Sequence, residues 1–267
     1  MRKQIHLLAI DPQNDFCDPQ NGALYVQGAE NDMNRLAEMI KRISPKLDDI
    51  HVTLDSHHLV HIANPVFWVG TDGKPPNPFT LISASDVKAG VWSTKVPSFT
   101  KKAIDYLEKL EATGKYVHCI WNPHCLIGSW GHAVFPALFE ALSDWEKEFA
   151  IVDYVTKGSN VWTEHFSAVQ AEVPMPDDPT TQVNTRLIDV LESADLILVA
   201  GEASSHCLKF TVEDIGNAFT DSSYIQKLVL LEDCTSPVTG FEKQQDDFIN
   251  EMTKRGMQLE KSTTFLK

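Results

Sequence analysis

Short apolar runs alternate along the chain with segments in which apolar residues recur at helical spacing. We expect strands at residues 5–10, 51–54, 116–121, 149–155, 196–200 and 227–231. We expect helices at residues 31–43, 101–110, 133–142, 185–191, 208–215 and 244–255. Strands that alternate with helices pair in parallel, and the helices cover both faces of the sheet. The sequence therefore predicts an α/β fold with three layers, α/β/α, around a mostly parallel, Rossmann-like sheet of six strands.

The strand expected at 196–200 leads into the most informative stretch of the chain. Gly201 ends the apolar run, small polar residues follow, and Cys207 begins a segment of helical period. A thiol at the start of a helix has its pKa lowered by the helix dipole, and free N–H groups there can stabilise an oxyanion. Cys207 is thus a candidate nucleophile. The alternative, a buried structural cysteine, is equally compatible with this stretch taken alone.

Chemically active side chains also follow the other expected strands. Asp11 follows the first strand, Asp55 and His57 the second, His124 the third and Lys157 the fourth. The carboxyl ends of parallel strands meet at one edge, which is where such sheets bind ligands. An aspartate there is a candidate general base, and an Asp with nearby His residues is a candidate metal site. Each residue alone also has an ordinary explanation as a turn or solvent-exposed side chain.

The metal ligands are not fully determined by this pattern. His61 is a rival to His124, because it would share a face with His57 if their loop were helical. One carboxylate and two imidazoles with added water suit zinc, iron or manganese.

The net charge and the cysteine pattern limit the binding partners and the cellular compartment that we expect. The net charge of −14 argues against binding to nucleic acid or to an anionic membrane surface. No signal peptide or membrane-spanning stretch is expected. The five cysteines form no CxxC pair, which suits free thiols in the cytoplasm. We expect residues 1–267 to form one domain, with an irregular insertion at about 64–97 that lies over the sheet edge.

Taken together, these motifs resemble the cysteine hydrolase (isochorismatase-like) superfamily, and within it the nicotinamidases most closely. The resemblance covers nearly the whole chain. The motifs that carry it are Asp11 with Gln13, Asp15 and Phe16; Asn21-Gly22-Ala23-Leu24 with Gly28; Asp55-Ser56-His57; Trp121-Asn122-Pro123-His124-Cys125; Lys157-Gly158; Phe166-Ser167-Ala168; and Gly201-Glu202-Ala203 through Cys207. Their combination is specific, although no single motif is.

The resemblance implies a catalytic triad of Asp11, Lys157 and Cys207. Cys207 would attack an amide carbon to form a thioester, which water then hydrolyses. The backbone N–H groups of Ala203 and Cys207 would form the oxyanion hole, and the peptide bond between Glu202 and Ala203 would be cis.

The resemblance also implies a divalent metal ion, zinc by first choice and iron or manganese otherwise, bound by Asp55, His57 and His124. In nicotinamidases this ion holds the pyridine nitrogen of the substrate. Phe16 and Trp121 match the aromatic walls of the pocket. The implied reaction converts nicotinamide and water into nicotinate and ammonia, a step of pyridine nucleotide salvage.

Two other functions stay open on the sequence. The first is the same chemistry on another small amide or ureide, and the second is a non-catalytic small-molecule-binding protein that keeps the fold. The isochorismatase-type vinyl-ether hydrolases fit less well, because they lack the nucleophile that is retained here as Cys207. The insertion, with Trp68 and Trp92, could close the site and change the substrate preference. Members of this family often assemble into homo-oligomers.

Overall fold

The computed structural model describes residues 2–148 and 150–267, and its centre is a parallel β-sheet. Among the described residues this sheet has six strands in the order β5-β2-β1-β6-β7-β8, and every neighbouring pair is parallel. The strands are β1 (Ile5–Ile10), β2 (Asp49–Asp55), β5 (Asp153–Lys157), β6 (Leu196–Gly201), β7 (Leu228–Leu231) and β8 (Gln258–Glu260).

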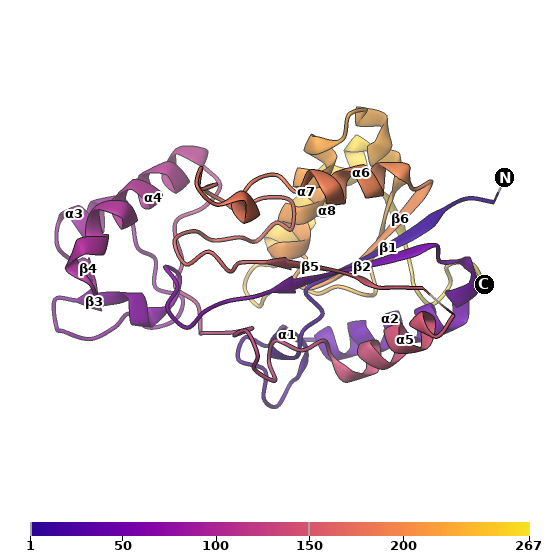
Figure 1. The fold of residues 1–267 in the computed structure, drawn as a ribbon, viewed down its shortest axis with the longest axis horizontal. Helices are drawn as coiled ribbons and strands as arrows, with labels where there is room; N and C mark the ends of the chain where they lie inside the picture. Colours follow the sequence, from indigo (N-terminus) through magenta and orange to yellow (C-terminus); the bar gives the residue numbers. More distant parts are fainter. Residues whose placement is uncertain (1, 149) are drawn as a thin grey trace.

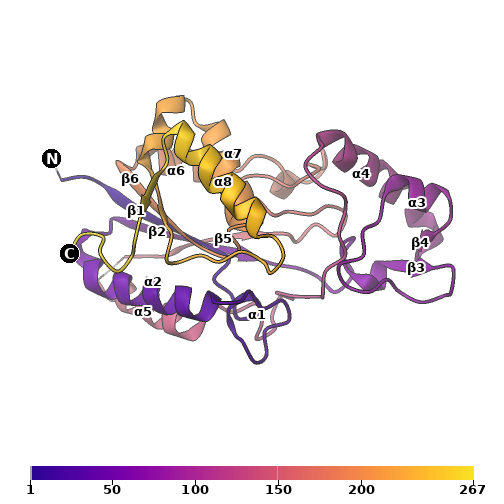
Figure 2. The ribbon, with the colours of Figure 1, turned by 180° about the vertical axis from the view of Figure 1, so that it is seen from behind.

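Helices cover both faces of this sheet (Figures 1 and 2). One face carries α2 (Ala29–Ile43) and α5 (Pro136–Glu146), with the short α1 (Asn14–Cys17) beside them. The other face carries α6 (Thr185–Ser193), α7 (Cys207–Ala218) and α8 (Glu242–Arg255). This confirms the expected three-layer α/β/α fold.

The central strand β1 shows why the layers form on both sides. All its residues are buried, and they alternate between two apolar cores. Leu7 and Ala9 pack with α2 and α5, whereas Leu8 and Ile10 pack with α6, α7 and α8. A strand whose two faces are both covered favours apolar residues at nearly every position, and in this run only His6 is polar.

In the central sheet, one expected strand is wrong and one strand was not expected. Residues 116–121 are extended but outside the central sheet, with a single isolated bridge between Cys119 and Leu81. The apolar character of this segment comes from tertiary packing instead, since Ile120 and Trp121 enter two different cores. The sixth strand is β8, whose three residues are all exposed and therefore carry no apolar signal.

The edge strand β5 begins later than expected. The sequence predicts a strand over 149–155, whereas β5 begins at Asp153 and ends at Lys157; Phe149 lies outside the described residues. Its register against β2 places Asp55 directly opposite Lys157. The remaining expected strands and helices are present, with ends shifted by a few residues.

The segment expected to be an irregular insertion contains regular structure. It holds α3 (Ala84–Lys88) and an antiparallel pair of strands, β3 (Trp68–Gly70) and β4 (Trp92–Thr94). With α4 (Thr100–Thr113) it forms a lobe beyond the carboxyl end of β2 (Figures 1 and 2). Trp68, Tyr106 and Leu107 belong to the separate apolar core of this lobe. No helix among the described residues is long and apolar enough to cross a bilayer.

Candidate active site

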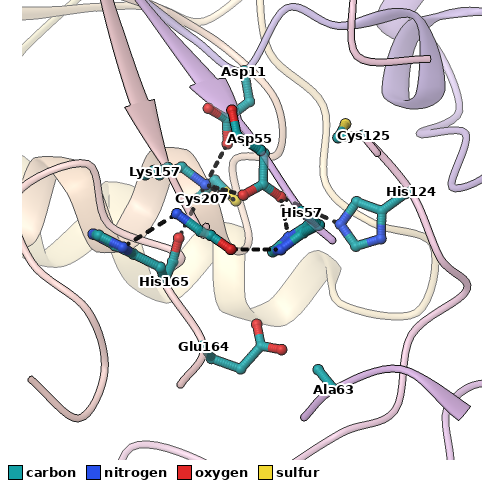
Figure 3. Close-up of polar contacts among 12 residues, drawn as sticks. Asp11, Asp55, His57, Ala63, His124, Cys125, Lys157, Glu164, His165 and Cys207 are labelled. Atoms are coloured by element: carbon teal, nitrogen blue, oxygen red, sulfur yellow. Dashed lines mark hydrogen bonds and ion pairs between the residues drawn. The ribbon is translucent and has the colours of Figure 1, made fainter. Parts of the chain in front are cut away.

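The carboxyl ends of four strands bring the expected catalytic residues together (Figure 3). Asp11 follows β1, Asp55 is the last residue of β2, and Lys157 is the last residue of β5. Cys207 is the first residue of α7, just beyond β6. All four side chains are buried. Residues far apart in the sequence therefore form one cluster.

The ammonium group of Lys157 lies at the centre of this cluster. Its Nζ atom is 2.8 Å from Asp11 Oδ2, 3.1 Å from Asp55 Oδ1 and 3.6 Å from Cys207 Sγ. It also donates a hydrogen bond to the His165 carbonyl at 3.0 Å. Burial disfavours the charge, but the two carboxylates outweigh it and keep the pKa of Lys157 well above its ordinary value. The site thus contains a fixed positive charge beside the thiol.

The carboxyl group of Asp11 is held in one orientation by Thr53. The Thr53 hydroxyl donates to Asp11 Oδ1 at 2.5 Å and accepts the Asp11 N–H at 3.0 Å. The other oxygen, Oδ2, receives no aligned hydrogen bond from a described residue, although Lys157 is close. Burial raises the pKa of Asp11, and Lys157 opposes that effect. Asp11 can therefore accept a proton at Oδ2 more readily than an exposed aspartate.

Cys207 lies against a turn whose backbone can bind an anion. Burial raises the pKa of the Cys207 thiol well above its ordinary value, with Lys157 acting in the opposite direction, so the resting group is a thiol. The preceding Glu202–Ala203 peptide bond is cis. Among the described residues, no protein group accepts a hydrogen bond from the N–H of Ala203 or of Cys207. Both N–H groups are free to stabilise negative charge on a substrate oxygen.

Asp55 also forms a candidate metal site with two histidines. Asp55 Oδ2 lies 2.9 Å from His57 Nε2 and 3.3 Å from His124 Nε2. The Nδ1 atoms of these rings face carbonyl oxygens, that of Gly158 at 3.0 Å and that of Asn122 at 2.7 Å. A carbonyl only accepts, so each Nδ1 carries a proton and each ring turns its Nε2 toward the carboxylate.

The three facing ligand atoms lie close enough together to share one cation. The ligand atoms of Asp55, His57 and His124 lie within 4.8 Å of one another, and all three residues are buried. A carboxylate with two imidazoles, each oriented by a backbone carbonyl, is a common set of ligands for zinc and related ions. The residues present therefore fit a divalent metal ion.

His61 does not belong to this group. Its Nε2 donates to the Thr163 carbonyl at 3.2 Å, and its Nδ1 accepts the Ala63 N–H at 3.2 Å. Both ring nitrogens are thus occupied by backbone groups. His61 packs against the His57 ring, with 4.7 Å between centroids, and supports the site without a free lone pair for a metal.

A cavity with about 460 Å³ of unfilled space opens in front of Cys207 and the candidate metal ligands. Phe16 and Trp121, the two expected aromatic walls, both line it. Ala203 and Cys207 line it on the side of the oxyanion turn. Asp11 and Lys157 lie behind the thiol and do not reach the cavity surface. This layout separates the groups that handle protons from those that would contact a ligand.

Sequence reasoning missed Glu164, which also lines the cavity. It is buried, and its Oε1 has no hydrogen-bond partner among the described residues. Burial raises the pKa of Glu164 well above its ordinary value, helped by the charge of Asp55. Its position in a loop without periodicity gave no signal in the sequence. His165, Phe166 and His206, also lining residues, lie in similar segments.

No protein-family model matches the chain, and no curated protein sequence matches it. Several solved structures, however, are similar to the chain. A nicotinamidase/pyrazinamidase of Acinetobacter baumanii is 19% identical, with 99% of each chain covered and a TM-score of 0.65. The yeast nicotinamidase bound to the inhibitor nicotinaldehyde is 18% identical, with 97% of this chain and 100% of that chain covered and a TM-score of 0.66.

A third similar structure is the pyrazinamidase of Pyrococcus horikoshii in complex with zinc. It is 16% identical, with 97% of this chain and 99% of that chain covered and a TM-score of 0.57. At these levels of sequence identity, the similarity concerns the fold alone. Along nearly its whole length, the chain has the fold of the nicotinamidase and pyrazinamidase structures.

Proposed function

We propose that the protein is a metal-dependent cysteine amidohydrolase that converts nicotinamide and water into nicotinate and ammonia. The observation that carries this proposal is the contact of Lys157 with both Asp11 and Cys207 beside a cavity that contains a candidate metal site. The similar structures, which are named as nicotinamidases and pyrazinamidases, support the choice of substrate.

In the first half of the reaction, the Cys207 thiol loses its proton to Asp11 as sulfur attacks the amide carbon. The Lys157 charge stabilises the thiolate, and the N–H groups of Ala203 and Cys207 stabilise the oxyanion. The C–N bond then breaks, and Asp11 delivers the proton to the departing ammonia. This leaves a thioester on Cys207.

In the second half, water attacks the thioester carbon. Asp11 takes a proton from the water, the C–S bond breaks, and the proton returns to the sulfur of Cys207. The raised pKa of Asp11 makes it a better proton acceptor for these transfers. The raised pKa of Cys207 favours the return of the proton to sulfur, and the Lys157 charge offsets the corresponding cost of forming the thiolate in the first half. The product acid gives up its remaining proton to ammonia or solvent and becomes the carboxylate, and the enzyme is restored.

Asp55, His57 and His124 would hold a divalent ion, for which zinc is the first choice, with iron and manganese as alternatives. When bound, the ion supplies a Lewis-acid contact for the pyridine nitrogen. Phe16 and Trp121 would flank the ring, which contributes about 0.5–1.5 kcal/mol beyond buried area. Together these contacts would orient the amide carbon toward Cys207.

A non-catalytic binding protein is a weaker explanation of this site. Burying the charges of Asp11, Asp55 and Lys157 together carries a desolvation penalty of several kcal/mol per ion. The affinity of a binding pocket for a small neutral ligand would not be increased by these buried charges, which lie behind the pocket wall.

All five cysteines are free thiols, and we therefore place the activity in the reducing cytoplasm.

The test is a comparison of kcat/KM for nicotinamide, benzamide and an aliphatic ureide, with ammonia release as the readout. Benzamide keeps the shape of nicotinamide but lacks the ring nitrogen, so it should be a much poorer substrate. Equal rates for nicotinamide and benzamide would remove the proposed role of the metal. A preferred ureide would favour the second candidate, a related hydrolase of another small amide.

A further inference from the structure

A second cavity, the outer cavity, adjoins the catalytic one and has about 830 Å³ of unfilled space. It lies between the segment after α4 and the first turns of α7. The lining side chains that matter here are Lys115, Tyr116, Trp121, Phe166, Lys209 and Phe210.

Three aromatic side chains line both cavities and form the partition between them: Trp121, Phe166 and His206. The ring centroids of Trp121 and His206 are 5.4 Å apart, and those of Phe166 and His206 are 5.6 Å apart. The wall is therefore one side chain thick. A ligand that leaves the catalytic cavity on this side enters the outer cavity.

The outer cavity offers a flat apolar wall with positive charge beside it. The rings of Phe166 and Phe210 are stacked, with centroids 5.6 Å apart and 15° between planes. The Nζ atoms of Lys115 and Lys209 lie 5.5 Å and 5.3 Å from the Phe210 centroid. An aromatic ring can pack on this wall while an acidic substituent contacts the ammonium groups.

Two glutamates reduce this positive charge only in part. Lys115 is 3.3 Å from Glu172, and Lys209 is 3.9 Å from Glu213. Burial raises the pKa of Glu172 to about 7 despite Lys115, so Glu172 is only partly ionised at neutral pH. Burial also raises the pKa of Glu213. Among the described residues that line the outer cavity, the charged ones are Lys115 and Lys209, in a chain whose net charge is −14.

Two buried donors add to this arrangement. The Tyr116 hydroxyl and the Trp121 Nε1–H have no hydrogen-bond partner among the described residues, and both side chains line the outer cavity. A buried donor without a partner is destabilising, so a ligand oxygen that accepts a hydrogen bond from either group would be favoured.

We propose that the outer cavity is a second binding site, specific for a flat aromatic carboxylate. Its identification with the reaction product, nicotinate, rests on the proposed function, but the recognition itself requires no turnover. Nicotinate released through the partition would be retained there, so inhibition by product would not be purely competitive with nicotinamide.

Calorimetric titration of the metal-loaded protein with benzoate tests the site directly. Benzoate lacks the ring nitrogen that the metal would bind, and comparison with the lysine variants separates its binding in the outer cavity from binding of its carboxylate at the metal. Replacing Lys209 by Met (K209M) keeps an unbranched side chain over Phe210 but removes the charge. Loss of one charge-assisted hydrogen bond should weaken benzoate binding about tenfold, which corresponds to about 1.4 kcal/mol. Lys115→Met should have a similar effect, and nicotinate should bind at two sites per wild-type chain.

Lys102→Met is the matched control, because Lys102 also lies over an aromatic ring, 4.3 Å from the Trp162 centroid, but does not line the outer cavity. Benzoate affinity that is unchanged in both K209M and K115M, or reduced equally in K102M, would overturn the proposal. Thermal unfolding of each variant verifies the fold. If benzoate binding depends on Lys209 but no amide is hydrolysed, the proposed function fails while this binding site stands.

Discussion

The Nζ atom of Lys157 lies 3.6 Å from the Sγ atom of Cys207, at the carboxyl end of the sheet. A thiolate formed there gains a fixed counter-charge without any movement of the chain. The same ammonium contacts Asp11 at 2.8 Å, so the proposed proton acceptor and the proposed nucleophile share one cation. This geometry leads to the first prediction.

Replacing Cys207 by alanine should reduce ammonia release from nicotinamide by at least about 10³-fold, because no other group can form the thioester. Fold and metal content should be unchanged, since among the described residues the Cys207 thiol is hydrogen-bonded to Lys157 and not to a candidate metal ligand. Cys234→Ala is the control: Cys234 is equally buried but belongs to the core on the α2 side. More than trace activity in Cys207→Ala would exclude covalent catalysis by this residue.

Metal binding should distinguish His124 from His61. His124→Ala removes an Nε2 lone pair that faces Asp55, so elemental analysis should find little bound metal. His61→Ala should retain the metal, because both nitrogens of His61 contact backbone groups. The reverse result, full occupancy without His124 and loss without His61, would show that the ligands are assigned wrongly.

A methyl group at Gly158 should damage the metal site specifically. Gly158 has a φ of +86°, and a Cβ there would lie 2.8 Å from Asp55 Oδ1. Gly90 has a similar φ of +75°, with nothing within 4 Å of its Cβ position. Both alanine variants should lose about 1–2 kcal/mol of stability from the positive φ. Only Gly158→Ala should also weaken metal binding in a metal titration; equal metal affinity in the two variants would contradict this account.

Glu172→Gln should change how stability depends on pH. Burial raises the pKa of Glu172 from 4.5 to about 7, so the native state binds this proton more tightly than the unfolded state. The resulting stabilisation is complete below pH 4.5 and is lost as pH rises to about 7. In Glu172→Gln the side chain is neutral at every pH, so this loss of stability with rising pH does not occur. Its advantage in unfolding free energy over wild type should therefore grow by up to about 3 kcal/mol between pH 4.5 and 8. Denaturant titrations at several pH values check this, and a constant difference would contradict it.

The parts of the fold that could be predicted are those with local signals. The strands that precede Asp11 and Cys207 are apolar at nearly every position because both their faces are covered. Since parallel strands end at one edge, the cluster around Lys157 followed from the order of the segments. The aromatic walls Phe16 and Trp121 depended on the family resemblance, because neither lies in a periodic pattern.

What could not be predicted depends on contacts between distant segments. The exposed strand β8 has no apolar pattern, and residues 116–121 are apolar because they pack between two cores. Glu164 could not be recognised because its burial arises from the packing of loops around it. The occupancy of both His61 nitrogens likewise depends on the backbone of residues 63 and 163.

The register that pairs Asp55 with Lys157 has a consequence for the order of folding. These residues are 102 positions apart, and the whole lobe of β3, β4, α3 and α4 lies between them. Closing so long a loop is slow compared with local contacts. Until β5 docks, Asp55 has no cation beside it, and its burial would be unfavourable by several kcal/mol. Docking of this edge strand, rather than collapse of the apolar cores, is therefore the step that completes the site.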